Sequence, residues 1–404
     1  MNSKILGTAL FLLTAATVGF YPQLHAKLVA APDPDGIAVD PVNVLVVPEG
    51  KPKIDVVFVL DTTGSMSGLI QTAKDKIWSI ARTMASAQPT PEIRIGLVAY
   101  RDRGDAYVTR VTDLSADLDS VYATLMDYQA DGGGDTPESV NAALADAVHR
   151  MSWSQDSQAY QVIFLVGDAP PHMDYAGEMR YPEIVAAAKE KGIVINTIQC
   201  GLMPITIDPW ERIAALGQGR FFQVEQAGGA VAWTTPFDSD IAQLSARLDR
   251  TRLYYGTVEE KETMQAKMAA TDKLHAEASV ASLARRGAFN ASAAGKANSL
   301  GSKELVDAVT RGEVDLATLD TDMLPASLKP LAPAEQAAVV GRLADERAQL
   351  SRQIRELAEQ RDAWLEKKVE EEGGAEDSLD HKIFETVSEQ AGKTGLTYEG
   401  GPEY

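Results

Sequence analysis

Short apolar runs rich in valine and isoleucine recur between residues 54 and 224, and they constrain the fold more than any other feature of the sequence. Continuous runs of this kind are typical of strands that are buried on both faces of a parallel sheet. Segments with helical periodicity lie between them, so strand and helix alternate along the chain. The predicted strands are 54–60, 93–99, 162–166, 193–198 and 221–224, with an edge strand at 107–112. The predicted helices are 69–87, 137–151, 179–191, 209–216 and 239–253.

This alternation predicts an α/β domain built on a doubly wound, mostly parallel sheet that is flanked by helices, as in Rossmann-like folds. We assign this domain to residues 53–255. In such a sheet, ligands bind in the crevice at the carboxyl ends of the central strands. We therefore expect the functional residues to follow directly after the predicted strands.

Strand signals vanish after residue 255, and residues 256–404 are predicted as an α-helical C-terminal domain with a long amphipathic helix at about 334–372. Apolar residues recur in this helix every seven positions, as in a coiled coil, but charged residues occupy other core positions of the same seam. Packing within the helical domain is therefore favoured, and self-association through these helices is the alternative. The apolar positions are Leu343, Leu350, Leu357 and Trp364, and the charged positions are Arg347, Arg361 and Lys368.

The N-terminus has the features of an export signal. Lys4 precedes an apolar stretch at 5–20, and small residues follow as far as Ala26. This pattern predicts a signal peptide at 1–26 and then a proline-rich lead at 27–52. The apolar stretch is shorter than the roughly 20 residues that span a bilayer, so we expect cleavage and no transmembrane span in the mature chain, with an uncleaved anchor as the alternative. Export without disulfides favours a bacterial periplasmic or extracellular protein.

Charge and cysteine content narrow the classes of function. The chain has 58 acidic residues against 38 lysines and arginines, with a net charge of −20 and one cysteine. Nucleic acids and anionic membranes are negative and would be repelled by such a chain. A single cysteine excludes an intramolecular disulfide framework and a multi-cysteine zinc site. The classes of binding partner that remain are a cation, a basic protein and a small ligand.

The most informative motif follows the first predicted strand. There Asp61 ends the apolar run, and the hydroxyls of Thr63 and Ser65 follow two and four positions later. A carboxylate with two hydroxyls makes an all-oxygen site of the kind that suits Mg²⁺, Mn²⁺ or Ca²⁺. A second carboxylate, Asp168, follows the strand at 162–166. The alternative is that Asp61 and Ser65 only cap the next helix.

A glycine-rich loop at 131–139 adds a third segment to the same edge of the sheet. Its three consecutive glycines indicate a sharp turn or a close approach of the backbone. Thr136 is expected to be the N-cap of the next helix and Pro137 its first residue. The full predicted site is Asp61, Thr63, Ser65, Thr136 and Asp168. His172 lies near its rim, but we interpret it as a solvated loop residue and not as a ligand.

These motifs resemble a von Willebrand factor type A domain. The resemblance covers about residues 53–253 and includes Thr136 in its glycine-rich loop and Asp168 after a buried strand. It implies that the five predicted residues form a metal-ion-dependent adhesion site, with Mg²⁺, Mn²⁺ or Ca²⁺ bound through the hydroxyls and partly through water. An open coordination position would then accept an Asp or Glu side chain of a protein partner. The sequence departs from the commonest pattern at Thr63, which replaces a serine and keeps the hydroxyl.

The sequence thus predicts an exported, non-enzymatic protein-binding module of the adhesion type. Acidic residues outnumber basic ones in segment 101–150, so we expect the acidic group of the partner to be flanked by Lys or Arg. One alternative is a scaffold subunit of an envelope complex that assembles through the helical domain. Another is a Mg²⁺-dependent phosphohydrolase with Asp61 as nucleophile, but Thr63 replaces the second Asp that such enzymes carry.

Overall fold

The computed structural model describes residues 51–226, 233–372, 379–398 and 401. The predicted signal peptide and all but the last two residues of the predicted lead lie outside these ranges. Residues Gly50–Tyr404 form one compact unit. No helix of the described ranges is both long enough and apolar enough to cross a membrane.

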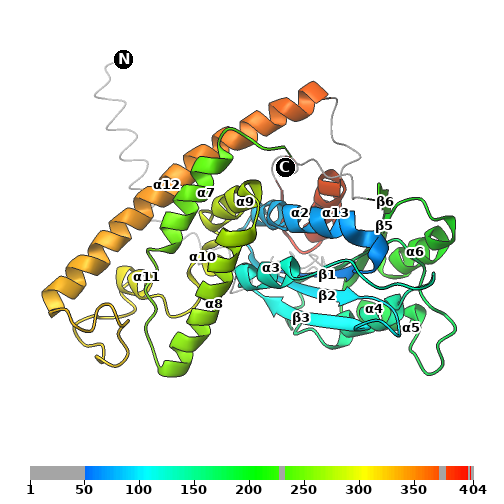
Figure 1. The fold of residues 1–404 in the computed structure, drawn as a ribbon, viewed down its shortest axis with the longest axis horizontal. Coiled ribbons are helices and arrows are strands. Elements are labelled where there is room, and N and C mark those ends of the chain that lie inside the picture. The colour runs from blue at the N-terminus through cyan, green and yellow to red at the C-terminus, as the bar shows by residue number, and fades with distance from the viewer. Residues whose placement is uncertain (1–50, 227–232, 373–378, 399–400, 402–404) are drawn as a thin grey trace, which may run out of the picture. The chain divides into compact units, whose positions relative to one another are not determined.

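A six-stranded sheet forms the centre of this unit, in the order β3-β2-β1-β4-β5-β6 (Figure 1). All neighbouring strands are parallel except β3, which runs antiparallel to β2 at one edge. The doubly wound, mostly parallel sheet and the edge strand are therefore confirmed, and the antiparallel direction of that strand is a further finding. The strands are β1 (Lys53–Asp61), β2 (Glu92–Tyr100), β3 (Thr109–Ser115), β4 (Tyr160–Gly167), β5 (Val194–Cys200) and β6 (Gln218–Val224).

Helices cover both faces of the sheet, which explains why its strands are apolar throughout. Along β1, Val56 and Phe58 enter the core beneath α2, α3 and α13, whereas Val57 and Val59 enter the core beneath α4, α5 and α6. The first layer consists of α2 (Ser67–Ala85), α3 (Leu118–Met126) and α13 (Leu379–Gly392). The second consists of α4 (Val140–His149), α5 (Tyr181–Glu190) and α6 (Pro204–Leu216).

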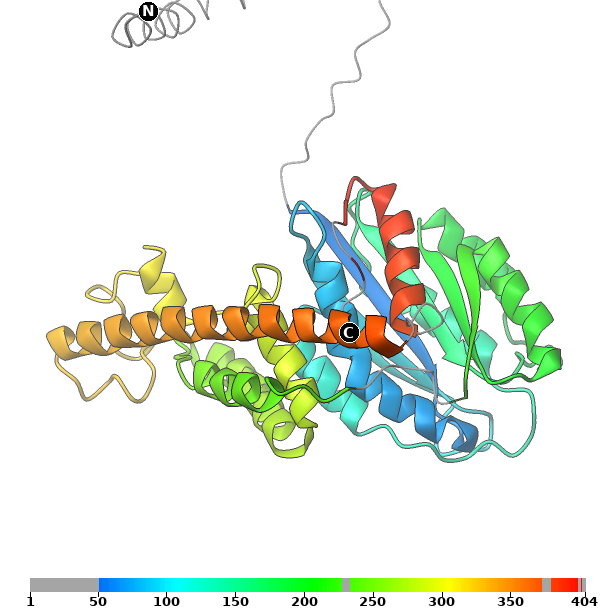
Figure 2. The ribbon, with the colours of Figure 1, turned by 90° about the horizontal axis from the view of Figure 1, so that it is seen from above.

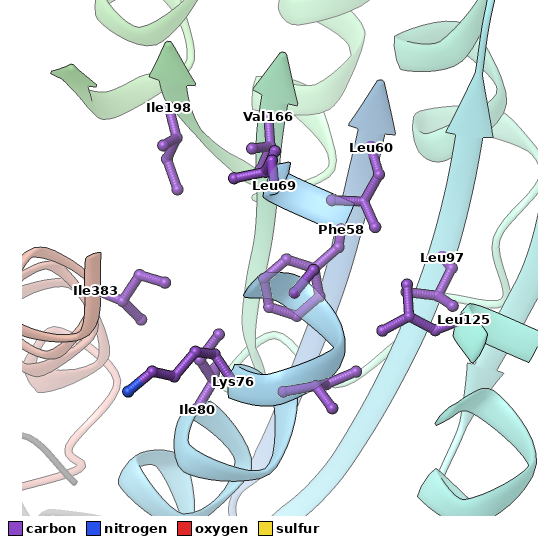
Figure 3. Close-up of a pocket in the computed structure, with 12 residues that line it drawn as sticks. Phe58, Leu60, Leu69, Lys76, Ile80, Leu97, Leu125, Val166, Ile198 and Ile383 are labelled. Atoms are coloured by element: carbon purple, nitrogen blue, oxygen red, sulfur yellow. The ribbon is translucent and has the colours of Figure 1, made fainter. Parts of the chain in front are cut away.

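A small cavity of about 30 Å³ lies in the first core, between the sheet and helices α2 and α13 (Figure 3). Phe58 and Leu60 of β1 face it from the sheet, and Ile80 and Ile383 face it from the two helices. This volume is about that of one water molecule, and the lining is almost wholly apolar. It is a packing void and not a ligand site.

The chain after the sheet is helical, as predicted. It contains α7 (Asp238–Asp249), α8 (Val258–Glu277), α9 (Val280–Asn290), α10 (Lys296–Leu300), α11 (Leu305–Thr310) and the long α12 (Pro333–Glu372). These helices also contact the sheet domain: α9 packs on α2, and α8 packs on α3. The boundary at residue 255 remains a prediction, and contacts between helices and sheet domain cross it.

The long helix packs on its own chain. Leu350 and Ile354 of α12 are buried against Ile241 of α7 and Ala284 of α9. Figures 1 and 2 show α12 running alongside α7. Two of the three charged residues of the predicted seam pair with other elements of the chain: Arg347 binds Glu304 at 2.8 Å, and Arg361 binds Asp238 at 2.9 Å. Intramolecular packing therefore accounts for the middle of the apolar repeat and for these two charged interruptions. Self-association stays a prediction.

Helix α4 begins at Val140, with Ser139 as its N-cap, and not at Pro137. The predicted N-cap role of Thr136 is wrong. The reason is that Glu138 is extended and pairs with the loop after β4: its N–H donates to Pro170 O at 3.0 Å, and its carbonyl accepts from His172 N at 3.1 Å. This pairing holds the glycine-rich loop against the end of β4.

The C-terminal helix α13 returns to the sheet, which the sequence pattern did not indicate. Gln390 exchanges two hydrogen bonds with Asn196 of β5, at 2.8 and 3.1 Å, and accepts one from the Tyr160 hydroxyl at 2.7 Å. All three side chains are buried. Residues more than 190 positions apart are thus joined by one closed polar network.

Candidate functional site

The loop after β1 folds around the Asp61 carboxylate. Thr63 donates to Asp61 Oδ1 twice, from its backbone N–H at 2.9 Å and from its hydroxyl at 2.7 Å. The Ser65 hydroxyl lies 3.4 Å from the Thr63 hydroxyl and is in an exposed residue. The three predicted residues of this motif therefore lie together, with Asp61 and Thr63 buried beneath Ser65.

Asp168 joins this group because β4 is the direct neighbour of β1 in the sheet. Gly167 is the last residue of β4 and lies next to Asp61. A Cβ atom built on Gly167 would lie 3.0 Å from Asp61 Oδ2 and 2.4 Å from the Tyr100 hydroxyl. Only glycine permits this approach. The Gln226 amide donates to Asp168 Oδ2 at 2.8 Å and to Ser65 O at 3.4 Å, and so links the two loops.

The glycine-rich loop lies on the same group. Gly64 N–H donates to Gly132 O at 3.1 Å, and Asp131 N–H donates to Thr62 O at 3.2 Å. Gly132 and Gly133 have φ values of +77° and +74°, in the left-handed region that favours glycine. The expected close approach of backbone is thus present.

Thr136 is the predicted residue that the structure does not bring into the hydrogen-bonded group. It is exposed, and within the described residues it shares no hydrogen bond with Asp61, Thr63, Ser65 or Asp168. Thr136 lies on the glycine-rich loop, three residues after Gly133. Gly133 is the part of this loop that approaches the group, since a Cβ atom built on it would lie 3.1 Å from Thr63 Cβ. The structure therefore unites four of the five residues and leaves Thr136 on the adjoining loop.

Carboxyl groups crowd this edge of the sheet. Burial raises the pKa of Asp61 to about 7, although the hydrogen bonds from Thr63 act in the opposite direction. Burial also raises the pKa of Glu138 to about 9, with the charges of Asp61 and Asp102 adding to the effect. Within the described residues, Asp61 Oδ2 and Glu138 Oε2 are buried without a hydrogen-bond partner. These two carboxyl oxygens, at the same edge of the sheet, each need a proton or a cation as a partner.

Glu138 and Gln226 were not expected at the site. Glu138 stands two residues after Thr136, in the segment that was predicted as the first turn of a helix. Gln226 lies two residues after β6, which is two strand positions from β4 in the sheet, yet its amide reaches Asp168 at the end of β4. The raised pKa of Glu138 and its burial are properties of the folded chain, so no sequence signal marked it.

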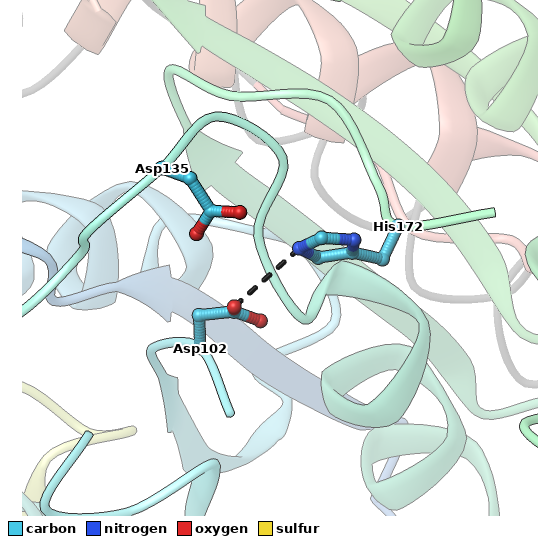
Figure 4. A group of neighbouring side chains, drawn as sticks. All are labelled: Asp102, Asp135 and His172. Carbon is cyan, nitrogen blue, oxygen red and sulfur yellow. Dashed lines mark ion pairs between the residues drawn. The ribbon is translucent and has the colours of Figure 1, made fainter. Parts of the chain in front are cut away.

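A second group of possible ligands lies beside the first. Asp102, Asp135 and His172 each direct one ligand atom to a common region, and these atoms lie within 4.8 Å of one another (Figure 4). The group could hold a metal ion. His172 is only 5% exposed, so its interpretation as a solvated loop residue is wrong. It is buried because the loop after β4 pairs with Glu138 and turns the imidazole inwards.

Comparison with known proteins agrees with this fold. Residues 55–218 match the family model described as von Willebrand factor A domain. The chain therefore contains a von Willebrand factor A domain, a class of domain that generally binds other proteins and is usually non-catalytic.

Two curated proteins resemble part of this domain. The putative ariadne-like RING finger protein R811 of Acanthamoeba polyphaga mimivirus is 27% identical over 122 residues, which are 30% of this chain and 11% of that protein. The alpha-protein kinase vwkA of Dictyostelium discoideum is 27% identical over 121 residues, which are 30% of this chain and 19% of that protein. The chain thus matches less than a fifth of the length of either relative.

Solved structures give distant likenesses. BatB from Bacteroides thetaiotaomicron is 16% identical, with a TM-score of 0.33 over 43% of this chain and 90% of that one. The SpRpn10 VWA domain is 14% identical, with a TM-score of 0.33 over 44% of this chain and 89% of that one. At these values the likeness carries no argument about function.

Proposed function

We propose that this protein captures a carboxylate side chain of a protein partner through a divalent cation at the carboxyl edge of its sheet. The observation that carries the proposal is the buried Asp61 Oδ2, which accepts no hydrogen bond within the described residues and adjoins Asp168 and Glu138. Burying a carboxylate oxygen that accepts no hydrogen bond is unfavourable in free energy, and a bound cation would offset that penalty. The donor set fits Mg²⁺, with Mn²⁺ and Ca²⁺ as alternatives.

The residues have separate roles in this proposal. Asp61 and Asp168 provide negative charge, and Thr63 holds Asp61 in place through two hydrogen bonds. The exposed Ser65 hydroxyl offers a neutral oxygen at the surface, and the family resemblance assigns the same role to Thr136. Neutral hydroxyls leave the charge of a divalent ion incompletely balanced. A bound ion would therefore supply an electrophilic position that attracts one further, external carboxylate.

Ion binding is tested first, by calorimetry with Mn²⁺ and with Mg²⁺. Ser65→Ala removes an exposed hydroxyl, so we expect the fold to persist and the affinity to fall at least about tenfold. Ser67→Ala is the matched control, because Ser67 is an exposed serine two residues away at the start of α2. Equal affinity in both variants, or no ion binding by the unaltered protein, contradicts the proposal.

Partner capture is tested by affinity purification from a bacterial periplasmic extract, with Mg²⁺ or with EDTA. A partner that is released by EDTA and by Ser65→Ala supports carboxylate capture. A partner that is retained in both cases points to the scaffold alternative. We also propose export, and N-terminal sequencing of the protein from a bacterial host tests it: an intact Met1 contradicts cleavage of the signal peptide.

A further inference from the structure

We propose that Asp102, Asp135 and His172 form a second metal site, which takes a borderline transition ion such as Zn²⁺ and shares no ligand with the site around Asp61 (Figure 4). A set of one imidazole nitrogen and two carboxylate oxygens suits Zn²⁺ and its neighbours in the first transition series better than Mg²⁺. Three protein ligands leave one tetrahedral position open.

The hydrogen bond of His172 to Asp174 determines which ring nitrogen is available. His172 Nδ1 lies 2.8 Å from Asp174 Oδ1, an oxygen of an exposed carboxylate, and a carboxylate can only accept a hydrogen bond. The Nδ1 atom thus carries the proton. In a neutral imidazole the lone pair is then on Nε2. A histidine that donates to a carboxylate with one nitrogen and faces acidic ligands with the other is the usual arrangement of a zinc-binding histidine.

The surroundings of Nε2 suit a metal ion. Nε2 is buried and has no hydrogen-bond partner within the described residues, and it lies 3.4 Å from Asp102 Oδ2. A nitrogen lone pair and a carboxylate oxygen repel one another at this distance unless a proton or a metal ion lies between them. Ligand atoms of a tetrahedral zinc ion with bonds of about 2.0–2.1 Å are about 3.3–3.5 Å apart. The observed separation of these two atoms is already suitable.

Asp102 is held in position by two donors. The Ser139 hydroxyl donates to Asp102 Oδ1 at 2.8 Å, and the Tyr175 hydroxyl donates to Oδ2 at 2.7 Å. The Tyr175 ring also stacks on His172, with centroids 3.9 Å apart. One tyrosine thus orients both buried ligands, and such outer contacts are characteristic of metal centres.

The third ligand, Asp135, lies on the glycine-rich loop between Gly134 and Thr136. A Cβ atom at Gly134 would meet nothing within 4 Å, so the loop is open on that side next to Asp135. The three ligand atoms lie within 4.8 Å of one another, whereas the ligand atoms of a tetrahedral zinc ion are about 3.3–3.5 Å apart. We therefore expect the ion to draw Asp135 inwards, which makes this exposed residue the most informative one to change.

Zinc binding is measured on the full chain by calorimetry with Zn²⁺ in excess Mg²⁺, and Co²⁺ serves as a visible probe. We expect one Zn²⁺ per chain and, for Co²⁺, the absorption of a tetrahedral site. Asp135→Asn should weaken Zn²⁺ binding at least about tenfold. Asp131→Asn is the matched control, since Asp131 is another exposed aspartate of the same loop, and it should leave the affinity unchanged. Ser65→Ala should also leave it unchanged.

Three results overturn the proposal. The first is the absence of stoichiometric Zn²⁺ binding by the unaltered protein. The second is an equal effect of Asp135→Asn and Asp131→Asn. The third is a nuclear magnetic resonance spectrum in which His172 is doubly protonated at neutral pH and does not change with Zn²⁺, because an imidazolium between Asp102 and Asp174 would then explain the cluster. If Ser65→Ala removes the zinc, the ion occupies the other site, and the proposal is also wrong.

Discussion

Arg286 of α9 is the residue whose removal should most weaken the attachment of the helical region to the sheet domain. Its guanidinium is fully buried and donates to Asp119 of α3 at 2.7 and 2.6 Å and to Asp249 of α7 at 2.8 and 3.3 Å. Burial alone would raise the pKa of Asp119, but the charge and hydrogen bonds of Arg286 hold it well below its usual range. One guanidinium thus binds both carboxylates.

Arg286→Met keeps most of the side-chain volume and removes the charge. Removing one partner of a buried ion pair typically costs about 3–5 kcal/mol. Two carboxylates lose their partner here, but Lys267 remains 4.0 Å from Asp119, and Arg252 remains 3.3 Å from Asp249. We therefore expect a loss of about 3–5 kcal/mol in the free energy of unfolding at pH 7, and not twice that amount. Denaturant titration followed by circular dichroism measures it.

The pH dependence gives a second test of the same reasoning. In the unaltered protein the depressed pKa of Asp119 contributes stability above the ordinary value of 3.8, and this is lost as the pH falls through the folded value. In Arg286→Met the two carboxyls lose the guanidinium that most strongly opposes burial and keep only their weaker partners, so the pKa of each rises and they take up protons at a higher pH in the folded state. The deficit should therefore be smaller at pH 5 than at pH 7.

Arg311→Met is the matched control for this prediction. Arg311 is also in the helical region and pairs with Asp307 at 2.9 Å and Glu313 at 2.8 Å, but it is 52% exposed. Exposed pairs contribute about 0–1 kcal/mol, so its replacement should change little. The reasoning fails if the two variants lose equal stability, or if the deficit of Arg286→Met is the same at pH 5 and pH 7.

Three further predictions concern single positions. Glu138 keeps its proton up to a pKa of about 9 while the unfolded chain loses it near 4.5, so metal-free protein should lose stability as the pH rises between these values. Asp61, with a pKa of about 7, adds to this loss only at the lower pH values, so Glu138→Gln should remove the slope between about pH 7 and 9 in denaturation curves with EDTA, and an unchanged slope there refutes it. Ile354→Ala should lower the free energy of unfolding by about 2–5 kcal/mol, because it removes a side chain buried between α12 and α7. The exposed Glu356→Ala is the control and should change little, so similar melting temperatures for the two variants would contradict this packing. Gln390→Ala should lower the free energy of unfolding by about 1–3 kcal/mol, since it leaves the buried Asn196 without two hydrogen bonds. If this is the cause, the backbone amides of α13 should also lose protection in hydrogen exchange.

The strands of this fold were predictable because each carries its own signal. A run such as 162–166 is apolar at every position, and helices on both faces of the sheet require that pattern. Helix α3 (Leu118–Met126) was missed because it is short and lies between an edge strand and a glycine-rich loop. The docking of α13 was missed because it depends on Gln390 meeting Asn196 across the fold, and no local pattern encodes that meeting.

The residues of the candidate site also divide into those that the sequence could predict and those that it could not. Asp61 and Asp168 were predictable because the ends of neighbouring parallel strands share one edge, so their place follows from strand order alone. His172 was misinterpreted because a histidine in a loop with two prolines is ordinarily solvated. Its burial comes from the pairing of its backbone with Glu138, which the sequence presented as helical. Long-range backbone pairing, and not side-chain chemistry, was the missing information.

Buried acids in this protein fall into two kinds, and the difference supports a binding role for the sheet edge. Asp119 is neutralised by Arg286, and Asp238 is neutralised by Arg361 at 2.9 Å, so these acids hold helices together and are complete within the chain. At the sheet edge, Asp61 and Glu138 are equally buried, yet no lysine or arginine forms an ion pair with either among the described residues. A chain that pairs its structural acids with arginine but forms no such pair at these two residues has left room for an external cation. The unfavourable pKa values of about 7 and about 9 are then properties of the metal-free state, and a divalent ion would remove both.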